Sequence, residues 1–150
     1  MSVGIDAIPD SVVSREDDDG DGTTSNQLGL EIELKSDWLS IGAEISNLTS
    51  GATRAYLQDD SGSDIDIIDI SDKSSGDAFT FDDVELDSGE IYRIVLDAEG
   101  SDYTRGFAGD GTNYPYTTDD IDITGVVLDG DISTSDEARA VNNIGNVGFD

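Results

Sequence analysis

The chain has 150 residues, of which 35 are Asp or Glu and 7 are Lys or Arg, and its formal net charge is -28. This charge excludes nucleic acid and anionic membrane surfaces as direct partners, because both are bound through clustered cations. The absence of His and Cys excludes a Ser-His-Asp triad, a Cys-His pair, a disulfide and the usual zinc sites. We therefore expect a protein that is not an enzyme.

The acidic composition has a second consequence, which concerns the solvent. Asp is preferred over Glu, and Lys35 and Lys73 are the only lysines. Short carboxylates hold water and cations, whereas lysine adds a flexible apolar stem to a surface. Salt at roughly 1 M shortens the Debye length to about 3 Å and so screens the repulsion among these charges. The composition favours a haloarchaeon or one of its viruses as the source, with an acidic mesophilic domain as the alternative.

The N-terminal segment predicts no targeting signal. Residues 1–13 contain neither a basic region nor an apolar run, and no stretch of about eighteen apolar residues occurs anywhere in the chain. We expect synthesis in the host cytoplasm, without a signal peptide. Residues 1–150 are interpreted as a single domain with a short N-terminal arm at 1–9 and an acidic surface loop at 15–26.

Apolar residues then alternate with polar ones in short runs that end at Gly, Asp and Ser. This pattern predicts half-buried antiparallel strands joined by tight turns. Strands are expected at 28–34, at 39–45 with Leu39 on the buried face, and at 54–57, 65–70, 79–81, 84–86, 91–96, 103–107, 121–128 and 140–149. Only residues 134–142 hint at a helical period. The fold class is all-β, an antiparallel β-sandwich, with a jelly-roll topology as first choice and an immunoglobulin-like sandwich as second.

The acidic loop contains a calcium-like motif. Asp17, Asp19 and Asp21 spell D-x-D-x-D-G with Gly22, and alternating carboxylates of this kind converge on a hard cation in calcium loops. An EF-hand would need Glu at the twelfth loop position, which here is Leu28. Two interpretations stay open, a shorter calcium loop and a solvated acidic loop.

Aromatic residues gather in the segment that follows the expected 103–107 strand. Tyr103, Tyr114 and Tyr116 lie close in sequence to Asp110 and Asn113. Aromatic rings can cover the apolar face of a sugar. Carboxylates accept hydrogen bonds from its hydroxyls, and amides both accept and donate them. These five residues form the candidate glycan site. The alternative is that the Tyr114-Pro115-Tyr116 turn only anchors a loop onto the sandwich. Trp38 is likewise expected to pack in the core rather than to bind a ligand.

The overall pattern of the chain resembles a β-sandwich module of structural proteins from haloarchaeal tailed viruses. The resemblance lies in residues 8–15, 29–46, 49–57, 74–81, 89–107, 113–124 and 143–150. It implies a compact sandwich in a tail fibre, a spike or a capsid turret or decoration, where it meets the glycosylated host surface. No functional residue is carried over from the family to a position of this chain.

These observations predict a non-enzymatic virion protein of a halophilic archaeal virus, displayed on the particle surface and contributing to attachment to the host. The expected partners are other copies of the chain, other virion proteins and a host glycan or glycoprotein. Two alternatives remain from the sequence: a cellular carbohydrate-binding or calcium-dependent adhesion module, and a purely structural capsid or tail cement protein.

Overall fold

The computed structural model describes the backbone of residues 3–6, 21–23, 27–45, 53–74, 76–97, 102–107, 116–117, 119–128, 131–133, 139–141 and 144–149. Side chains are described at 29–45, 53–74, 76–97, 117, 119–125 and 127. Within these residues the chain forms strands and no helix, so no helix that could cross a membrane occurs in the described part.

The strands follow one another along the whole described chain. They are β1 (Val3–Asp6), β2 (Asp21–Thr23), β3 (Gln27–Leu34), β4 (Ile41–Ile45), β5 (Arg54–Asp59), β6 (Asp64–Asp69), β7 (Ala78–Phe81), β8 (Ile91–Asp97), β9 (Asp102–Phe107), β10 (Tyr116–Thr117), β11 (Ile121–Leu128), β12 (Asp131–Ser133), β13 (Arg139–Val141) and β14 (Ile144–Phe149).

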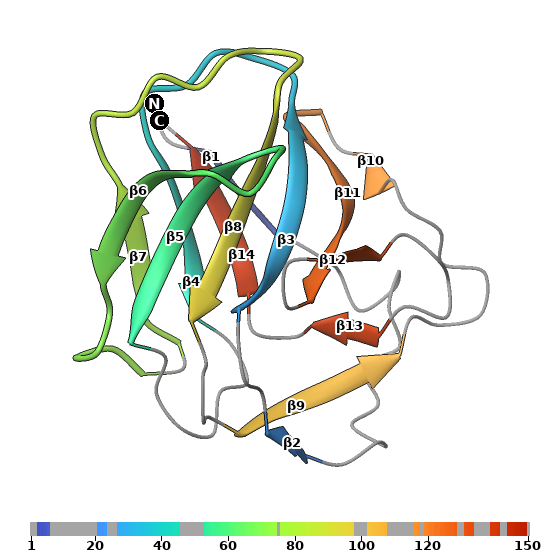
Figure 1. Cartoon of the computed structure of the whole chain (residues 1–150). Coiled ribbons are helices and arrows are strands. Elements are labelled where there is room, and N and C mark those ends of the chain that lie inside the picture. Colours follow the sequence, from blue (N-terminus) through green and yellow to red (C-terminus); the bar gives the residue numbers. More distant parts are fainter. Residues whose placement is uncertain are drawn as a thin grey trace.

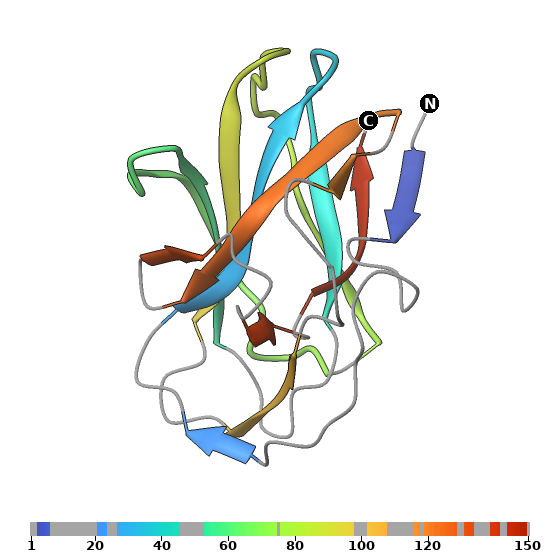
Figure 2. The same cartoon turned by 90° about the vertical axis from the view of Figure 1, so that its right-hand side faces the viewer.

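Two sheets make the body of the molecule, and every strand pair in them is antiparallel. The large sheet has the order β10-β11-β3-β8-β5-β6, with β12 also paired to β11, and the four-stranded sheet has the order β1-β14-β4-β7. Figures 1 and 2 show the two sheets as facing layers, and β5 and β6 form the end of the large sheet opposite β10. Within the described residues the sheets are open, not closed. The predicted antiparallel β-sandwich is confirmed.

The core lies between the two sheets. It takes every second side chain of β3, β4 and β8, because successive side chains of a strand point to opposite faces. The buried set is Leu30, Ile32, Leu34, Ile41, Ala43, Ile45, Ala55, Leu57, Ile70, Phe79, Phe81, Val84, Leu86, Tyr92, Ile94, Leu96, Ile121 and Ile123. Phe79 and Phe81 meet edge to face with ring centroids 5.8 Å apart. Trp38 packs against this core, as the sequence predicts.

The outer face of the large sheet, which points away from the core, carries a second buried cluster. Tyr56, Val95 and Val127 belong to β5, β8 and β11. The strand register aligns Val95 with Gly29 of β3 and Gly29 with Val127. A Cβ atom at Gly29 would overlap the carbonyl oxygen of Ile94, so only glycine fits this close approach of β3 and β8.

Several predicted strands have different boundaries in the structure. The expected 39–45 strand begins at Ile41, and Leu39 is 68% exposed, so the prediction that it faces the core is wrong. Val84 and Leu86 are buried without forming a named strand, although Leu86 makes an isolated bridge to Trp38. The described part of the expected 140–149 strand is divided between β13 and β14.

The N-terminal part of the chain also joins the sheets. Within the expected arm, β1 pairs with β14 from Val3 opposite Phe149 to Asp6 opposite Asn146. Within the expected acidic loop, β2 pairs with β9, and β9 also pairs with β13 in a third, three-stranded sheet. Both segments therefore contribute strands to the fold of this chain.

Candidate functional site: the β5–β6 hairpin

The hairpin formed by β5 and β6 is the most sharply defined polar structure among the described residues. Its tip is organised by Asp59, whose Oδ1 accepts hydrogen bonds from Ser61 N at 2.9 Å, Ser61 Oγ at 2.6 Å and Ser63 N at 3.0 Å. Gly62 adopts a φ of 84°, which glycine tolerates without steric cost, and its N–H donates to Asp59 O at 3.1 Å. The side chain of Asp59 thus fixes the turn at the tip.

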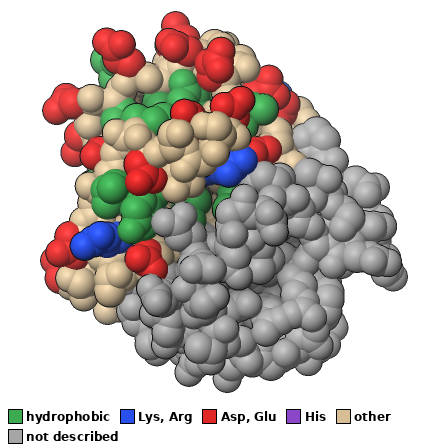
Figure 3. Space-filling view, in the orientation of Figure 1, with side chains coloured by type: hydrophobic (Ala, Val, Ile, Leu, Met, Phe, Trp, Pro, Cys, Tyr) green, Lys and Arg blue, Asp and Glu red, His purple; other side chains and the backbone are tan. Residues whose placement is uncertain are grey.

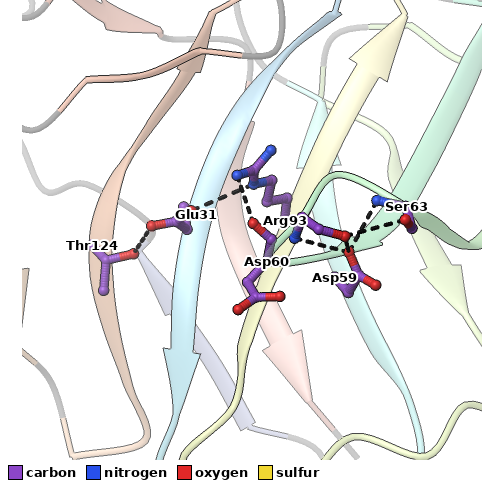
Figure 4. Close-up of polar contacts among 7 residues, drawn as sticks. Glu31, Asp59, Asp60, Ser63, Arg93 and Thr124 are labelled. Carbon is purple, nitrogen blue, oxygen red and sulfur yellow. Dashed lines mark hydrogen bonds and ion pairs between the residues drawn. The ribbon is translucent and has the colours of Figure 1, made fainter.

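Arg93 of β8 anchors this tip to the sheet, as Figure 4 shows. Its Nη2 donates to the carbonyl oxygen of Asp60 at 2.8 Å, and its Nε lies 3.4 Å from Glu31 Oε2. Thr124 Oγ1 donates to the other oxygen of Glu31 at 2.9 Å. The side chains of Arg93 and Glu31 are only 12% and 13% exposed. One polar network therefore links the hairpin tip to β8, β3 and β11.

Within the described residues, β6 is the last strand of the large sheet and leaves one edge free. Two of its three isoleucines, Ile65 and Ile67, are 44% and 47% exposed. Ile67 pairs with Tyr56 of β5, so its side chain lies on the outer face beside that ring. Figure 3 shows this face, where hydrophobic side chains reach the surface among many carboxylates. The edge thus combines exposed apolar side chains with negative charge.

The backbone of β6 alternates between the sheet and the open edge. Ile70 N donates to Thr53 O at 3.1 Å, and the register continues through Ile68 opposite Ala55. In an antiparallel ladder only alternate residues turn their N–H and C=O groups toward a given neighbour. Ile68 and Ile70 therefore face β5, while the backbone groups of Ile67 and Asp69 face outward.

Two aspartates accept hydrogen bonds from backbone N–H groups along this edge. Asp66 Oδ1 accepts the N–H of Ile67 at 2.9 Å, and Asp69 Oδ1 accepts the N–H of Ser71 at 2.8 Å. Edge strands of natural sheets are often protected by charged residues that discourage pairing with another strand. Asp66 and Asp69 have that position here.

Hydrogen bonds lower the pKa of two of these carboxyl groups. The pKa of Asp59 lies below its usual value of 3.8, mainly because the Ser61 hydroxyl and then the Ser63 N–H stabilise the carboxylate. The pKa of Asp69 is lowered in the same way by the side chain and backbone of Ser71. Both groups are therefore charged at neutral pH.

The residues predicted for the glycan site are distributed over two sheets as far as the structure describes them. The backbone of Tyr103 lies in β9 of the three-stranded sheet and that of Tyr116 in β10 of the large sheet. Figures 1 and 2 show β9 and β10 well apart. Asp110, Asn113 and Tyr114 lie outside the described residues, and the glycan site stays a prediction.

The predicted calcium motif is described only at its end. Asp21 opens β2, and its neighbour Gly22 pairs with Tyr103 of β9. Asp17 and Asp19 lie outside the described residues, so calcium binding stays a prediction. Within the part of the chain that the structure describes, no three acidic side chains converge as metal ligands.

The Arg93 network escaped the sequence-based prediction. Arg93 lies in the middle of a central apolar strand, and a charged residue at that place is a signal for a buried or half-buried partner. Its partners Glu31 and Asp60 are distant in sequence and come together only through the strand register.

No protein-family model, no curated protein and no solved structure gives a significant match to this chain.

Proposed function

We propose that this chain is a non-enzymatic structural protein of a halophilic archaeal virus, displayed on the particle surface as a capsid decoration, a turret or a tail fibre. In that position it contributes to attachment to the glycosylated host surface. The observation that carries the proposal is the anchored β5–β6 hairpin, which presents exposed isoleucines among carboxylates on an acidic, open sandwich. A contact surface of this kind serves binding and assembly.

The sandwich would act as a rigid support for these contacts. Its core spans both sheets, and the Arg93 network holds the hairpin tip in one position relative to β8. A rigid contact surface loses little conformational entropy on binding. Weak contacts of single copies then add up when several copies engage together on one particle.

The test is to locate the protein and then to separate its roles. Mass spectrometry of purified particles should detect the chain, and imaging with a labelled antibody should place it on their exterior. Particles that lack it should adsorb to host cells more slowly while keeping their stability in molar KCl. Absence of the chain from purified particles would contradict the proposal.

A second candidate function is that of a cement protein joining capsid or tail subunits. The free β6 edge favours it, because an open strand with exposed Ile65 and Ile67 is suited to a permanent protein contact. For a cement protein, removal should lower the temperature at which particles break and leave adsorption by intact particles unchanged. The two measurements on the same deletion therefore distinguish the candidates.

A further inference from the structure

The free edge of β6 has the geometry of a docking site for one more strand. Ile67 and Asp69 turn their backbone groups outward, and Ile67 exposes 47% of its side-chain surface beside them. Strand addition uses outward backbone groups for affinity and neighbouring side chains for selectivity. The side chains beside this edge therefore define which strand can bind.

Those side chains disfavour a second copy of the chain. A β6 strand from another copy would bring its own Asp64, Asp66 and Asp69 to an edge that already carries these three carboxylates. Like charges placed opposite each other across a strand pair destabilise it. In addition, the Asp66 carboxylate already accepts a hydrogen bond from the N–H of Ile67. An incoming acidic strand would displace this carboxylate and has no cation to pair with it.

A basic strand would be attracted, not repelled, by the carboxylates of this edge. We propose that the β6 edge binds an extended segment of a partner protein in which Lys or Arg alternates with apolar residues. A backbone carbonyl of the segment takes over the N–H of Ile67. Its apolar side chains cover Ile67 on the outer face, and its cations, which point to the opposite face, pair with the released carboxylate of Asp66. This inference rests on the proposed function, for which it names the chemistry of a virion or host partner.

The experiment uses the full chain and two synthetic peptides. One peptide alternates Lys with Val over ten residues, the other alternates Glu with Val, and both are blocked at their ends and carry fluorescein. Fluorescence anisotropy is measured at the lowest KCl concentration at which the circular dichroism of the protein is native. The Lys peptide should bind at least about tenfold more tightly than the Glu peptide, because the Asp66 carboxylate attracts lysine and repels glutamate.

Variants locate the binding to the edge. Ile67→Pro removes an outward N–H and leaves the ladder to β5 intact, so it should weaken binding of the Lys peptide by about tenfold. Ile67→Ser should weaken it as well, whereas Leu39→Ser is the matched control, since Leu39 is 68% exposed and lies outside the named strands. Asp66→Asn should bring the affinities of the two peptides closer together, whereas Asp69→Asn should change them less, because the Asp69 side chain lies on the outer face with Ile67.

The inference is overturned if the two peptides bind equally to the unaltered protein, or if Leu39→Ser and Ile67→Ser have the same effect. It is also overturned if the unaltered protein pairs with itself through β6, seen as a dimer in sedimentation that Ile67→Ser dissolves. Should Ile67→Pro fail to fold, the aspartate variants still decide the question. The proposed function is tested separately on virus particles, so either can fail alone.

Discussion

Gly29 lies where β3 and β8 of the large sheet approach each other closely. A Cβ atom there would overlap the carbonyl oxygen of Ile94 and lie 2.8 Å from its carbonyl carbon, so the backbone of β8 would have to move. We expect Gly29→Ala to lower the free energy of unfolding by about 3 kcal/mol. Gly89→Ala is the control, because Gly89 has a φ of 83° with open space around it, and about 1 kcal/mol is expected. Equal losses in urea unfolding would contradict this account.

Asp59 is the residue whose titration reports on the hairpin tip. Its pKa is lower in the folded chain than the 3.8 of a free side chain, so its hydrogen bonds stabilise the fold above about pH 4. That contribution to stability begins to decrease as the pH falls below 3.8, and it is lost once the pH has fallen through the lowered pKa, where the Asp59 carboxylate of the folded chain is protonated. Carboxyl-carbon NMR should show the low pKa directly. Ser61→Ala removes the largest cause and should bring the pKa of Asp59 back toward 3.8, while Ser88→Ala, in another turn, should leave it unchanged.

The β5–β6 hairpin depends as an element on its anchor in β8. Arg93→Met keeps much of the side-chain volume but removes the hydrogen bond to Asp60 and leaves the half-buried Glu31 carboxylate without its cation. We expect this substitution to lower the free energy of unfolding by about 2 kcal/mol. Amide exchange at the tip, for example at Gly62, should become faster than exchange in β3.

The matched control is Lys35→Met. Lys35 forms an ion pair of 3.0 Å with Asp122, but this pair is more exposed, with 34% and 22% of the side chains accessible. Salt bridges of this kind contribute about 1 kcal/mol or less. If Lys35→Met destabilises the protein as much as Arg93→Met does, the Arg93 network is not the special anchor that the geometry indicates.

The elements of the sandwich could be predicted because one face of each is buried. The alternation Leu30, Ile32, Leu34 marks β3 regardless of its partners, and the same holds for β8. Leu39 fits the same alternation but is exposed, because periodicity does not show where a strand begins. The hairpin site was harder to predict, since the meeting of Arg93 with Glu31 and Asp60 depends on the order of strands in the sheet.

At the scale of the whole molecule, the net negative charge opposes folding. A net charge of -28 on 150 residues repels itself in the compact state. We expect the melting temperature to rise by about 10 °C or more between about 0.1 M and 2 M KCl, as screening shortens the range of repulsion. Circular dichroism melts at a series of KCl concentrations measure this directly.

The control for this prediction is a variant with fewer charges and the same fold. Asp60→Asn, Asp72→Asn and Asp82→Asn change three exposed carboxylates for which no side-chain hydrogen bond is described. The triple variant should melt at a higher temperature in dilute buffer and depend less on KCl. A melting temperature that is the same in dilute buffer and in molar KCl would rule out the halophilic interpretation.

The pairing of β1 with β14 brings the beginning and the end of the described chain onto neighbouring strands. Val3 lies opposite Phe149 in this pair. A short covalent linker between the two would turn them into an ordinary hairpin. The polypeptide could then be reopened in the exposed turn at Gly89, which joins Leu86 to β8. A circular permutant built in this way should recover the same antiparallel registers, because none of them depends on the order in which the strands are synthesised.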